Sequence, residues 1–403
     1  MSSLAAWLHN IDPFAIQISG NFGLRWYGLA YLAAFVVGYY FTRRLVAVGH
    51  TTLAKTDAMD LVIHVAIGVV FGGRLGYVFF YQPSLLWHFT SDVPFWGVLM
   101  LNKGGMASHG GMIGVALAVW FYAQRAARRS AIVGLEKGVI LGHLACVKCK
   151  YDLHKQAVAG TCPECSTPVR ESVEAARIAK HSFLHLFDIT AISGATGFFF
   201  GRIANFINAE LIGRRCSPDL PWAVKFPQEM FNLSDNQLAE LAPAMQKIGV
   251  DAYVWHKAIS DGDRATIDMR LHQLINAIQD GGILGRSIGD AVAPLLTAHH
   301  PSQLYAALTE GLIVFVVLTL LWLKPRKPGV IAGWFGLLYG IMRIFNEFYR
   351  APDEHIKDLE YAATGFTRGQ WLSAGLSLIG IAIIAFSARR NVPAMGGLRK
   401  HGA

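Results

Sequence analysis

An arginine, two asparagines and a glutamate stand close together at the end of a long apolar stretch. The stretch, residues 183–210, reads FLHLFDITAISGATGFFFGRIANFINAE, and its last turns carry Arg202, Asn205, Asn208 and Glu210. An arginine at membrane depth costs about 2.5–3.5 kcal/mol on insertion scales, so it is seldom found there without a function. The pattern therefore predicts a polar site at one face of a membrane.

Further polar side chains recur near the ends of other apolar stretches. They are Tyr27; Arg74 and Tyr77; His109; His300, Ser302, Gln303 and Tyr305; and Tyr339, Arg343, Glu347 and Arg350. Arg343 and Glu347 are four residues apart, so on a helix they share one face and can form an ion pair. Each residue alone has a structural explanation, because tyrosines line membrane interfaces and arginine side chains can extend toward water.

The elements that must position these residues are membrane helices. Of the 403 residues, 53% are hydrophobic and only 16% are charged, whereas a soluble domain carries about 25% charged residues. A helix that crosses a bilayer needs roughly 17–25 apolar residues. Segments of this kind lie at residues 24–42, 59–80, 108–124, 183–207, 303–323, 329–349 and 371–388. The expected fold is an all-α integral membrane protein with about seven transmembrane helices.

The distribution of basic residues sets the expected topology. The net charge of +9 could suit a nucleic-acid partner, but the basic residues cluster in alternate loops. They are Arg43 and Arg44; Arg125, Arg128 and Arg129; Lys324, Arg326 and Lys327; and Arg389 and Arg390. The positive-inside rule makes these loops cytoplasmic, with the N-terminus outside and the C-terminus in the cytoplasm. No nucleic-acid partner is therefore expected. The same topology places Tyr27, His109, Arg202, His300 and Arg343 toward the external half, and this convergence favours a common site.

Two long loops complete the expected organisation. In order, it comprises spans 1–3 with the SHGG segment (1–124), a cytoplasmic loop (125–182), span 4 (183–208), an external insertion (209–300), spans 5–7 (301–390) and a cytoplasmic tail (391–403). A small amphipathic helical lid or decoration is expected in the external insertion, rather than a separate catalytic domain. Ser234 with Gln237 is typical of a capping box. Thr266 is expected to cap a second helix that ends at Gly281 and Gly282 and carries Leu271, Leu274, Ile275 and Ile278 on one face.

Four cysteines in the cytoplasmic loop have the spacing of a metal site. Cys146-x2-Cys149 and Cys162-x2-Cys165 form two knuckles whose four thiolates can enclose a tetrahedral zinc ion. Two disulfides or four free thiols are the alternatives, and the reducing cytoplasm disfavours disulfides. A site closed by four cysteines leaves no open coordination position, so structural Zn²⁺ in a zinc ribbon is expected, and no cofactor for catalysis. Cys216, in the external insertion, is expected to be an incidental thiol.

Several segments, in this order along the chain, resemble the signature segments of the prolipoprotein diacylglyceryl transferase family. They are RWYGL, GGRLGYVFFY, SHGG, GRIANFINAELIGR, HPSQLY and GLLYGIMRIFNEFYRAPD. The resemblance implies an enzyme that transfers the diacylglyceryl group of phosphatidylglycerol to the lipobox cysteine thiol of prolipoproteins and releases glycerol phosphate. It also implies a multi-pass protein of the bacterial cytoplasmic (inner) membrane, whose partners are the lipid bilayer and prolipoprotein signal peptides.

By position, the family's essential or substrate-binding residues fall on Tyr27, His109, Arg202, Asn205, Glu210, Gly213, Tyr339, Arg343 and Glu347. Because a guanidinium can contact two phosphate oxygens, Arg202 and Arg343 are assigned to the lipid phosphate. Asn205 and Glu210 are expected to hold the lipid headgroup or Arg202 itself, and Glu347 to orient Arg343. His109 is the candidate base for the thiol proton, or else it orients the SHGG turn.

The chain departs from the family's pattern in three places, and two other classes of protein stay open. Ala204 stands where the family usually has glycine, the cytoplasmic loop carries the cysteine ribbon, and the external insertion is longer than usual. A transporter or channel would also place charges inside a membrane, although no internal repeat supports it. An inactive relative could instead act as a membrane adaptor through its zinc ribbon.

Overall fold

The structure of the protein is a computed structural model. It describes residues 6–19, 22–48, 51, 53, 55–91, 94–100, 105–134, 138–140, 144, 146–153, 155–180, 183–351, 365–392 and 394–399. The chain divides into two compact units, each built from three separate stretches. Unit 1 comprises Met1–Ala33, Gly197–Ile313 and Tyr339–Gly375, and unit 2 comprises Ala34–Thr196, Val314–Leu338 and Leu376–Ala403.

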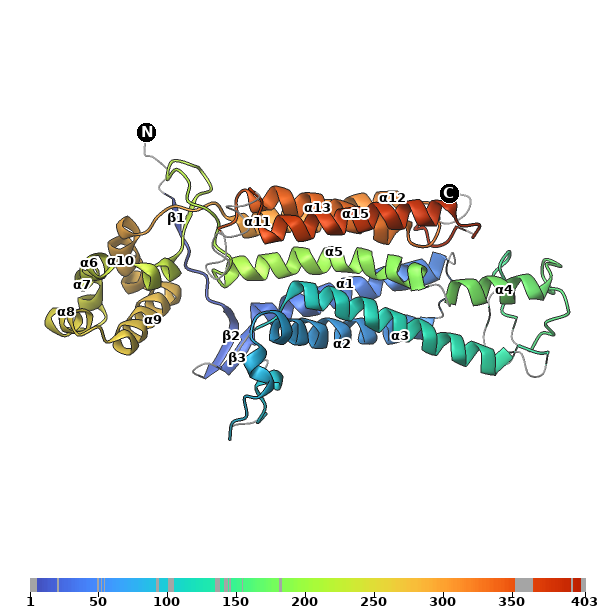
Figure 1. The fold of residues 1–403 in the computed structure, drawn as a ribbon, viewed down its shortest axis with the longest axis horizontal. Coiled ribbons are helices and arrows are strands. Elements are labelled where there is room, and N and C mark those ends of the chain that lie inside the picture. The colour runs from blue at the N-terminus through green and yellow to red at the C-terminus, as the bar shows by residue number, and fades with distance from the viewer. Residues whose placement is uncertain are drawn as a thin grey trace. The chain divides into compact units, whose positions relative to one another are not determined.

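Each apolar segment that was expected to span a membrane is helical over most of its length (Figure 1). The helices are α1 (Trp26–Val48), α2 (Lys55–Phe80), α3 (Ser108–Gly134), α5 (Phe183–Ile207), the continuous run α11 (Ser302–Ala306), η6 (Ala307–Ile313) and α12 (Val314–Leu321), α13 (Val330–Glu347) and α15 (Arg368–Arg389). In the part of the chain that the structure describes, four helices are long and apolar enough to cross a membrane: Ala58–Phe80, Phe183–Ile207, Ser302–Leu321 and Gly369–Arg389. Gly110–Gln124 is apolar but shorter. The protein is therefore a mostly helical membrane protein.

Within unit 2, glycines bring α2 and α3 into backbone contact. A Cβ atom added at Gly72 would lie 2.5 Å from the carbonyl oxygen of Gly110, and one added at Gly76 would lie 2.5 Å from the Gly110 Cα. Helices in lipid gain stability from such close packing, which larger side chains would prevent. Gly72, Gly76 and Gly110 thus serve helix packing.

Buried charged residues in unit 2 satisfy backbone groups. The guanidinium of Arg74 donates to the carbonyl oxygens of Val98 (2.8 Å), Gly97 (2.6 Å) and Gly105 (3.0 Å). The carboxylate of Asp188 accepts the N–H groups of Gly329 (2.8 Å) and Ala332 (2.7 Å) at the start of α13. The first turn of a helix lacks internal partners for these N–H groups, so Asp188 caps it. Both Arg74 and Asp188 therefore have structural roles.

Unit 2 also contains the short helices η1 (Pro83–Leu86), η2 (Gly97–Leu99) and α4 (Val169–Lys180).

Unit 1 contains two small sheets that the all-α expectation did not include. Strand β1 (Trp7–Leu8) pairs in parallel with β4 (Val224–Lys225), and β2 (Phe14–Ser19) forms an antiparallel hairpin with β3 (Phe22–Arg25). The β1–β4 pair joins residues more than two hundred positions apart, which local sequence patterns do not reveal.

The predicted insertion at 209–300 is largely helical from Pro227 to Leu295, as expected. Figure 1 shows its helices gathered together. They are η4 (Pro227–Asn232), α6 (Asp235–Ala239), α7 (Ala242–Lys247), α8 (Ala252–Ser260), α9 (Arg264–Asp280), α10 (Gly282–Val292) and η5 (Ala293–Leu295). The predicted apolar face of α9 (Leu271, Leu274, Ile275 and Ile278) is buried in their shared core, which also holds Met245 and Trp255.

The helix ends in this insertion test the capping predictions. The capping box is confirmed, since Gln237 Oε1 accepts the Ser234 N–H at 3.1 Å. Gly281, with φ of 72°, ends α9 as expected. The assignment of Thr266 as the cap was wrong: α9 begins earlier, and the carboxylate of Asp263 accepts the N–H of Thr266 at 3.1 Å. Asp263 and Thr266 are both good capping types, and only the backbone conformation distinguishes them.

His9 makes the stability of unit 1 sensitive to acid. Its ring is buried against Phe206 and Phe226, with centroid distances of 5.3 and 5.4 Å. Burial lowers the pKa of His9 from 6.5 to about 4. Below pH 6.5 the unfolded chain therefore binds a proton at His9, whereas the folded chain binds it only near pH 4. The contribution of the neutral His9 to the free energy of unfolding is complete above pH 6.5. It is lost as the pH drops toward 4, by at most about 3 kcal/mol.

The measurement is the thermal midpoint of the purified protein at about pH 7 and about pH 4.5. In His9→Phe the difference between the two midpoints should shrink, because the titrating ring is gone while the aromatic packing is retained. His256→Gln, at an exposed position on α8, is the control and should keep the wild-type difference. An unchanged difference in His9→Phe would contradict the prediction.

Candidate functional site

In unit 1, the side chains of α5, η6 and α13 meet at a buried carboxylate, Glu310. Arg202 donates to Glu310 Oε2 through Nε (3.2 Å) and Nη2 (3.0 Å). Arg343 Nη1 lies 3.6 Å from Glu310 Oε1. The Glu310 side chain is 0% exposed, whereas the side chains of Arg202 and Arg343 are 14% and 13% exposed. The two arginines assigned to a phosphate therefore converge on one point.

The predicted ion pair on α13 is present. Arg343 Nη2 lies 3.2 Å from Glu347 Oε2. Glu347 also accepts a hydrogen bond from the Thr367 hydroxyl at 3.1 Å, and a Cβ atom at Gly369 would lie 3.3 Å from Glu347 Oε1. Glu347 therefore lies between Arg343, on its own helix, and the segment Thr367–Gly369. Tyr339, one turn before Arg343, is buried, packs on Phe198 with ring centroids 4.4 Å apart and lies beside Arg202.

Tyr27, Asn205 and Glu210 form a second polar group. The Tyr27 hydroxyl donates to Glu210 Oε2 at 2.6 Å. The Asn205 amide donates to the Tyr27 hydroxyl and, at 3.2 Å, to Glu210 Oε2. Ala209 and Leu211, with φ of 53° and 54°, take the left-handed conformation on either side of Glu210. Such backbone strain is concentrated at functional sites. Glu210 therefore pairs with Tyr27 and Asn205, while Arg202 pairs with Glu310.

The backbone at Gly213 packs between two other backbone segments, at His300 and at Tyr349. Arg214 N donates to the Tyr349 carbonyl oxygen (2.8 Å), and His300 N donates to the Arg214 carbonyl oxygen (3.0 Å). Side chains of the HPSQLY segment hold the residues just before it: Gln303 donates to the carbonyl oxygen of Glu210 (2.6 Å) and Ser302 to that of Leu211 (3.2 Å). A Cβ atom at Gly213 would overlap the carbonyl oxygen of His300. These contacts give Gly213 a structural reason to be glycine.

We expect Gly213→Ala to lower the free energy of unfolding by at least about 2 kcal/mol, since backbone, unlike a flexible side chain, cannot move aside for the methyl group. The thermal midpoint in detergent measures the effect. Gly201→Ala is a matched control, because a Cβ atom there would meet nothing within 4 Å among the described residues. Equal midpoints for the two variants would show that Gly213 is not confined.

Two histidines, His109 and His300, were predicted to lie toward the same half of the protein as the arginines. His109 lies in the first turn of α3, which begins at Ser108, but its side chain is outside the described residues. His300 contacts the hydroxyl of Tyr305 through Nδ1 at 3.2 Å, and Trp222 donates to that hydroxyl at 2.7 Å.

Glu310 and Asn346 are site residues that the sequence patterns above did not single out. Asn346 is buried and its amide donates to Glu310 Oε1 at 3.1 Å and to the Thr309 hydroxyl at 2.6 Å. The available signal for Glu310 was a carboxylate inside the apolar segment 303–323. An ionisable residue in such a segment is itself a reason to look for a functional partner.

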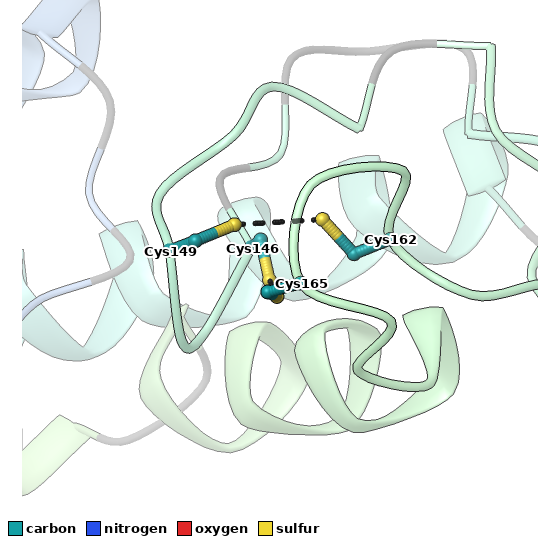
Figure 2. Close-up of side chains that lie close together, drawn as sticks. All are labelled: Cys146, Cys149, Cys162 and Cys165. Carbon is teal, nitrogen blue, oxygen red and sulfur yellow. Dashed lines mark hydrogen bonds between the residues drawn. The ribbon is translucent and has the colours of Figure 1, made fainter.

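The four ribbon cysteines in unit 2 come together as their spacing predicts. Figure 2 shows Cys146, Cys149, Cys162 and Cys165 pointing toward one another. Their sulfur atoms all lie within 4.8 Å, and the pairs Cys146–Cys165 and Cys149–Cys162 are 3.6 and 3.5 Å apart. Tetrahedral zinc–sulfur bonds of about 2.3 Å require sulfurs about 3.8 Å apart, whereas a disulfide requires about 2.05 Å. These four cysteines form no disulfide with one another, and the spacing of their sulfur atoms fits a zinc ion.

The two knuckles share one backbone design. In the first, Lys150 N donates to Cys146 O and Cys146 N to Tyr151 O; in the second, Ser166 N donates to Cys162 O and Cys162 N to Thr167 O. Hydrogen bonds from Thr167 lower the pKa of the Cys165 thiol, and the thiolate is the form that binds a metal. The knuckles rest on a small apolar core of Ile140, Leu153 and Val169.

The fold and the arginine site around Glu310 define a helical membrane protein with two buried arginines, Arg202 and Arg343, paired with carboxylates. Residues 13–144 and 172–386 match the sequence model of one family, described as prolipoprotein diacylglyceryl transferase. The chain belongs to this family, and the resemblance noted in its motifs is confirmed. The stretch between the two matched ranges, 145–171, contains all four ribbon cysteines.

Individual relatives agree with this assignment. The chain is 39% identical over 393 residues to the phosphatidylglycerol–prolipoprotein diacylglyceryl transferase of Bdellovibrio bacteriovorus, covering 95% of this chain and 94% of the relative. It is 31% identical over 382 residues to the enzyme of the same name from Ralstonia pickettii, covering 94% of each.

Proposed function

We infer that the protein transfers the diacylglyceryl group of phosphatidylglycerol to the lipobox cysteine of prolipoproteins, the first step of lipoprotein maturation. Family membership and the names of the relatives support the activity. The observation in this chain that carries it is the convergence of Arg202 and Arg343 on one point. A lipid phosphate beside Glu310 would meet N–H groups of both guanidinium groups at once, in surroundings where charged hydrogen bonds are strong.

The reaction replaces one bond to a glycerol carbon. The cysteine sulfur attacks the carbon that carries the phosphate ester, and a C–S bond forms while the C–O bond breaks. The electron pair stays on the phosphate oxygen, which leaves in glycerol phosphate, and the thiol proton goes to a base. Negative charge grows on the phosphate during this step, and fixed cations at the site of that charge stabilise the transition state.

In this proposal Arg202 and Arg343 bind the phosphate, and Glu347 orients Arg343. Tyr339, beside Arg202, lines the same site. Tyr27, Asn205, Glu210 and the backbone at Gly213 bind the glycerol headgroup, because hydroxyl, amide and carboxylate groups suit its hydroxyls. His109 takes the thiol proton, since histidine titrates near neutral pH.

We further propose seven spans in the bacterial inner membrane, with the N-terminus outside and the C-terminus in the cytoplasm. The alternating basic loops support this topology. In the cytoplasmic loop, Cys146, Cys149, Cys162 and Cys165 would hold a structural Zn²⁺. The ion's contribution would be four metal–sulfur bonds that fix the two knuckles on their core.

The test is to incubate purified protein with phosphatidylglycerol and a lipobox peptide and to measure the peptide's mass. We expect the mass of one diacylglyceryl group to be added and an equal amount of glycerol phosphate to be released. A peptide with serine in place of the lipobox cysteine is the control and should stay unmodified. An unmodified cysteine peptide would contradict the proposal, and solute flux in proteoliposomes without lipid consumption would favour a transporter.

A further inference from the structure

Glu310 is a charged residue for which the proposed reaction has no direct use. Its side chain is completely buried and contacts both arginines of the site. A carboxylate beside a phosphate site repels the phosphate, so Glu310 weakens the attraction that the arginines provide. Its place between them calls for a reason other than binding the substrate.

The geometry gives each oxygen of Glu310 to a different arginine. Oε2 accepts from Nε and Nη2 of Arg202, and Oε1 faces Nη1 of Arg343. Because a guanidinium has five N–H donors, both arginines keep further N–H groups for a ligand. One planar carboxylate therefore fixes the distance and the orientation between two guanidinium groups that come from different helices.

The surrounding structure fixes Glu310 in turn. Asn346 donates to Oε1 at 3.1 Å and to the hydroxyl of the preceding residue, Thr309, at 2.6 Å. Glu310 lies in the π-helical turn Ala307–Ile313, and such turns inside α-helices are frequent at functional sites.

The next residue brings Glu310 within reach of Arg202. A Cβ atom at Gly311 would lie 2.5 Å from Phe199 Cα, so the π-helical turn touches the backbone of α5 one turn before Arg202. The extra residue of the π turn and the missing side chain at Gly311 together place the carboxylate beside the guanidinium.

We propose that Glu310 is a positioning residue that holds Arg202 and Arg343 at a fixed spacing, so that their remaining N–H groups meet one lipid phosphate together. This inference rests on the proposed transferase function. Glu310 does not touch the reacting atoms and acts only through the arginines. The two arginines are balanced by Glu310 and Glu347, which lets the group be buried as neutral ion pairs until the anionic lipid arrives.

The decisive variant is Glu310→Gln, assayed with phosphatidylglycerol and a lipobox peptide. In glutamine an NH2 group replaces one carboxylate oxygen, so one of the two arginines loses its hydrogen-bond acceptor. The spacing between Arg202 and Arg343 is then no longer fixed, and kcat should fall by about 100-fold or more. The KM for phosphatidylglycerol should stay equal or fall, because a negative charge has left the site. Glu310→Asp keeps the charge but withdraws the carboxylate, and it should also lose kcat.

A double-mutant cycle with Arg343→Lys separates positioning from general damage. If Glu310 acts through the arginines, Glu310→Gln combined with Arg343→Lys should be little slower than the slower single variant. If Glu310→Gln does not fold, Glu310→Asp carries the same cycle. Wild-type kcat in the Glu310 variants, or losses that multiply in the double variant, would overturn the inference.

Asp188→Asn is the matched control. It makes the same change from carboxylate to amide at another fully buried position, on α5, where the carboxylate caps the start of α13. It should lower the thermal midpoint and leave kcat per folded molecule unchanged; an equal loss of kcat would overturn the assignment of Glu310. An inactive wild-type protein would reject the proposed function itself, whereas an active wild type with an equally active Glu310→Gln rejects only this inference.

Discussion

Lysine in place of Arg202 or Arg343 is expected to lower turnover by about 100- to 1,000-fold, the range seen when one well-placed charge-stabilising donor is removed. Arg202 uses two of its nitrogens on Glu310 and Arg343 uses two on Glu310 and Glu347. A lysine ammonium is a compact charge without the planar fork, so it cannot keep these carboxylates and bind two phosphate oxygens as well. The initial rate of diacylglyceryl transfer to a lipobox peptide measures the loss.

The control for this prediction is an exposed arginine in the helical segment 227–295. Arg264 Nη2 lies 3.7 Å from Asp235 Oδ1, and both side chains are more than half exposed. Exposed ion pairs of this kind contribute little to stability. Arg264→Lys should keep the wild-type rate. Wild-type turnover in both Arg202→Lys and Arg343→Lys would refute the assignment of these residues to the phosphate, and thermal midpoints of each variant show whether a loss of rate is a loss of fold.

The features predicted well from the sequence are those that depend on local composition. A helix in lipid satisfies its own backbone groups, so a long apolar run is sufficient to predict one. The ends are less determined: α3 continues to Gly134, ten residues beyond the expected limit of 124. The clustering of the four cysteines was predictable for the same reason, since each knuckle closes over a few neighbouring residues.

The features that were not predicted depend on contacts between distant segments. Arg74 and Arg202 are both arginines in apolar segments, yet Arg74 binds backbone carbonyls and Arg202 binds Glu310. What separates them is the packing around each guanidinium, such as the fit of Gly311 against Phe199. A sequence pattern shows which face of a helix is polar, but not which residue of another helix meets that face.

Loss of the proposed zinc ion is expected to unfold the cysteine-rich segment 138–168 and to leave diacylglyceryl transfer nearly unchanged. Structural zinc supplies about 10–16 kcal/mol of apparent binding energy in small zinc domains. The ribbon's own core is small, with Ile140, Leu153 and Val169 as its main apolar members besides the cysteines. Cys162→Ser or a strong chelator should therefore lower the zinc content from one ion per chain to near zero and open residues 138–168 to proteases.

The arginine site and the cysteine-rich segment belong to different units of the chain. The family's sequence model matches residues 13–144 and 172–386 and so does not include the four cysteines. We therefore expect the transfer rate to be retained when zinc is removed. Cys216→Ser is the matched control, because Cys216 is a free thiol in the other unit and should be dispensable for both zinc and rate. Zinc bound one to one in Cys162→Ser would refute the four-cysteine site. A transfer rate that falls in step with the zinc content would contradict the prediction. It would show that diacylglyceryl transfer depends on the folded cysteine-rich segment.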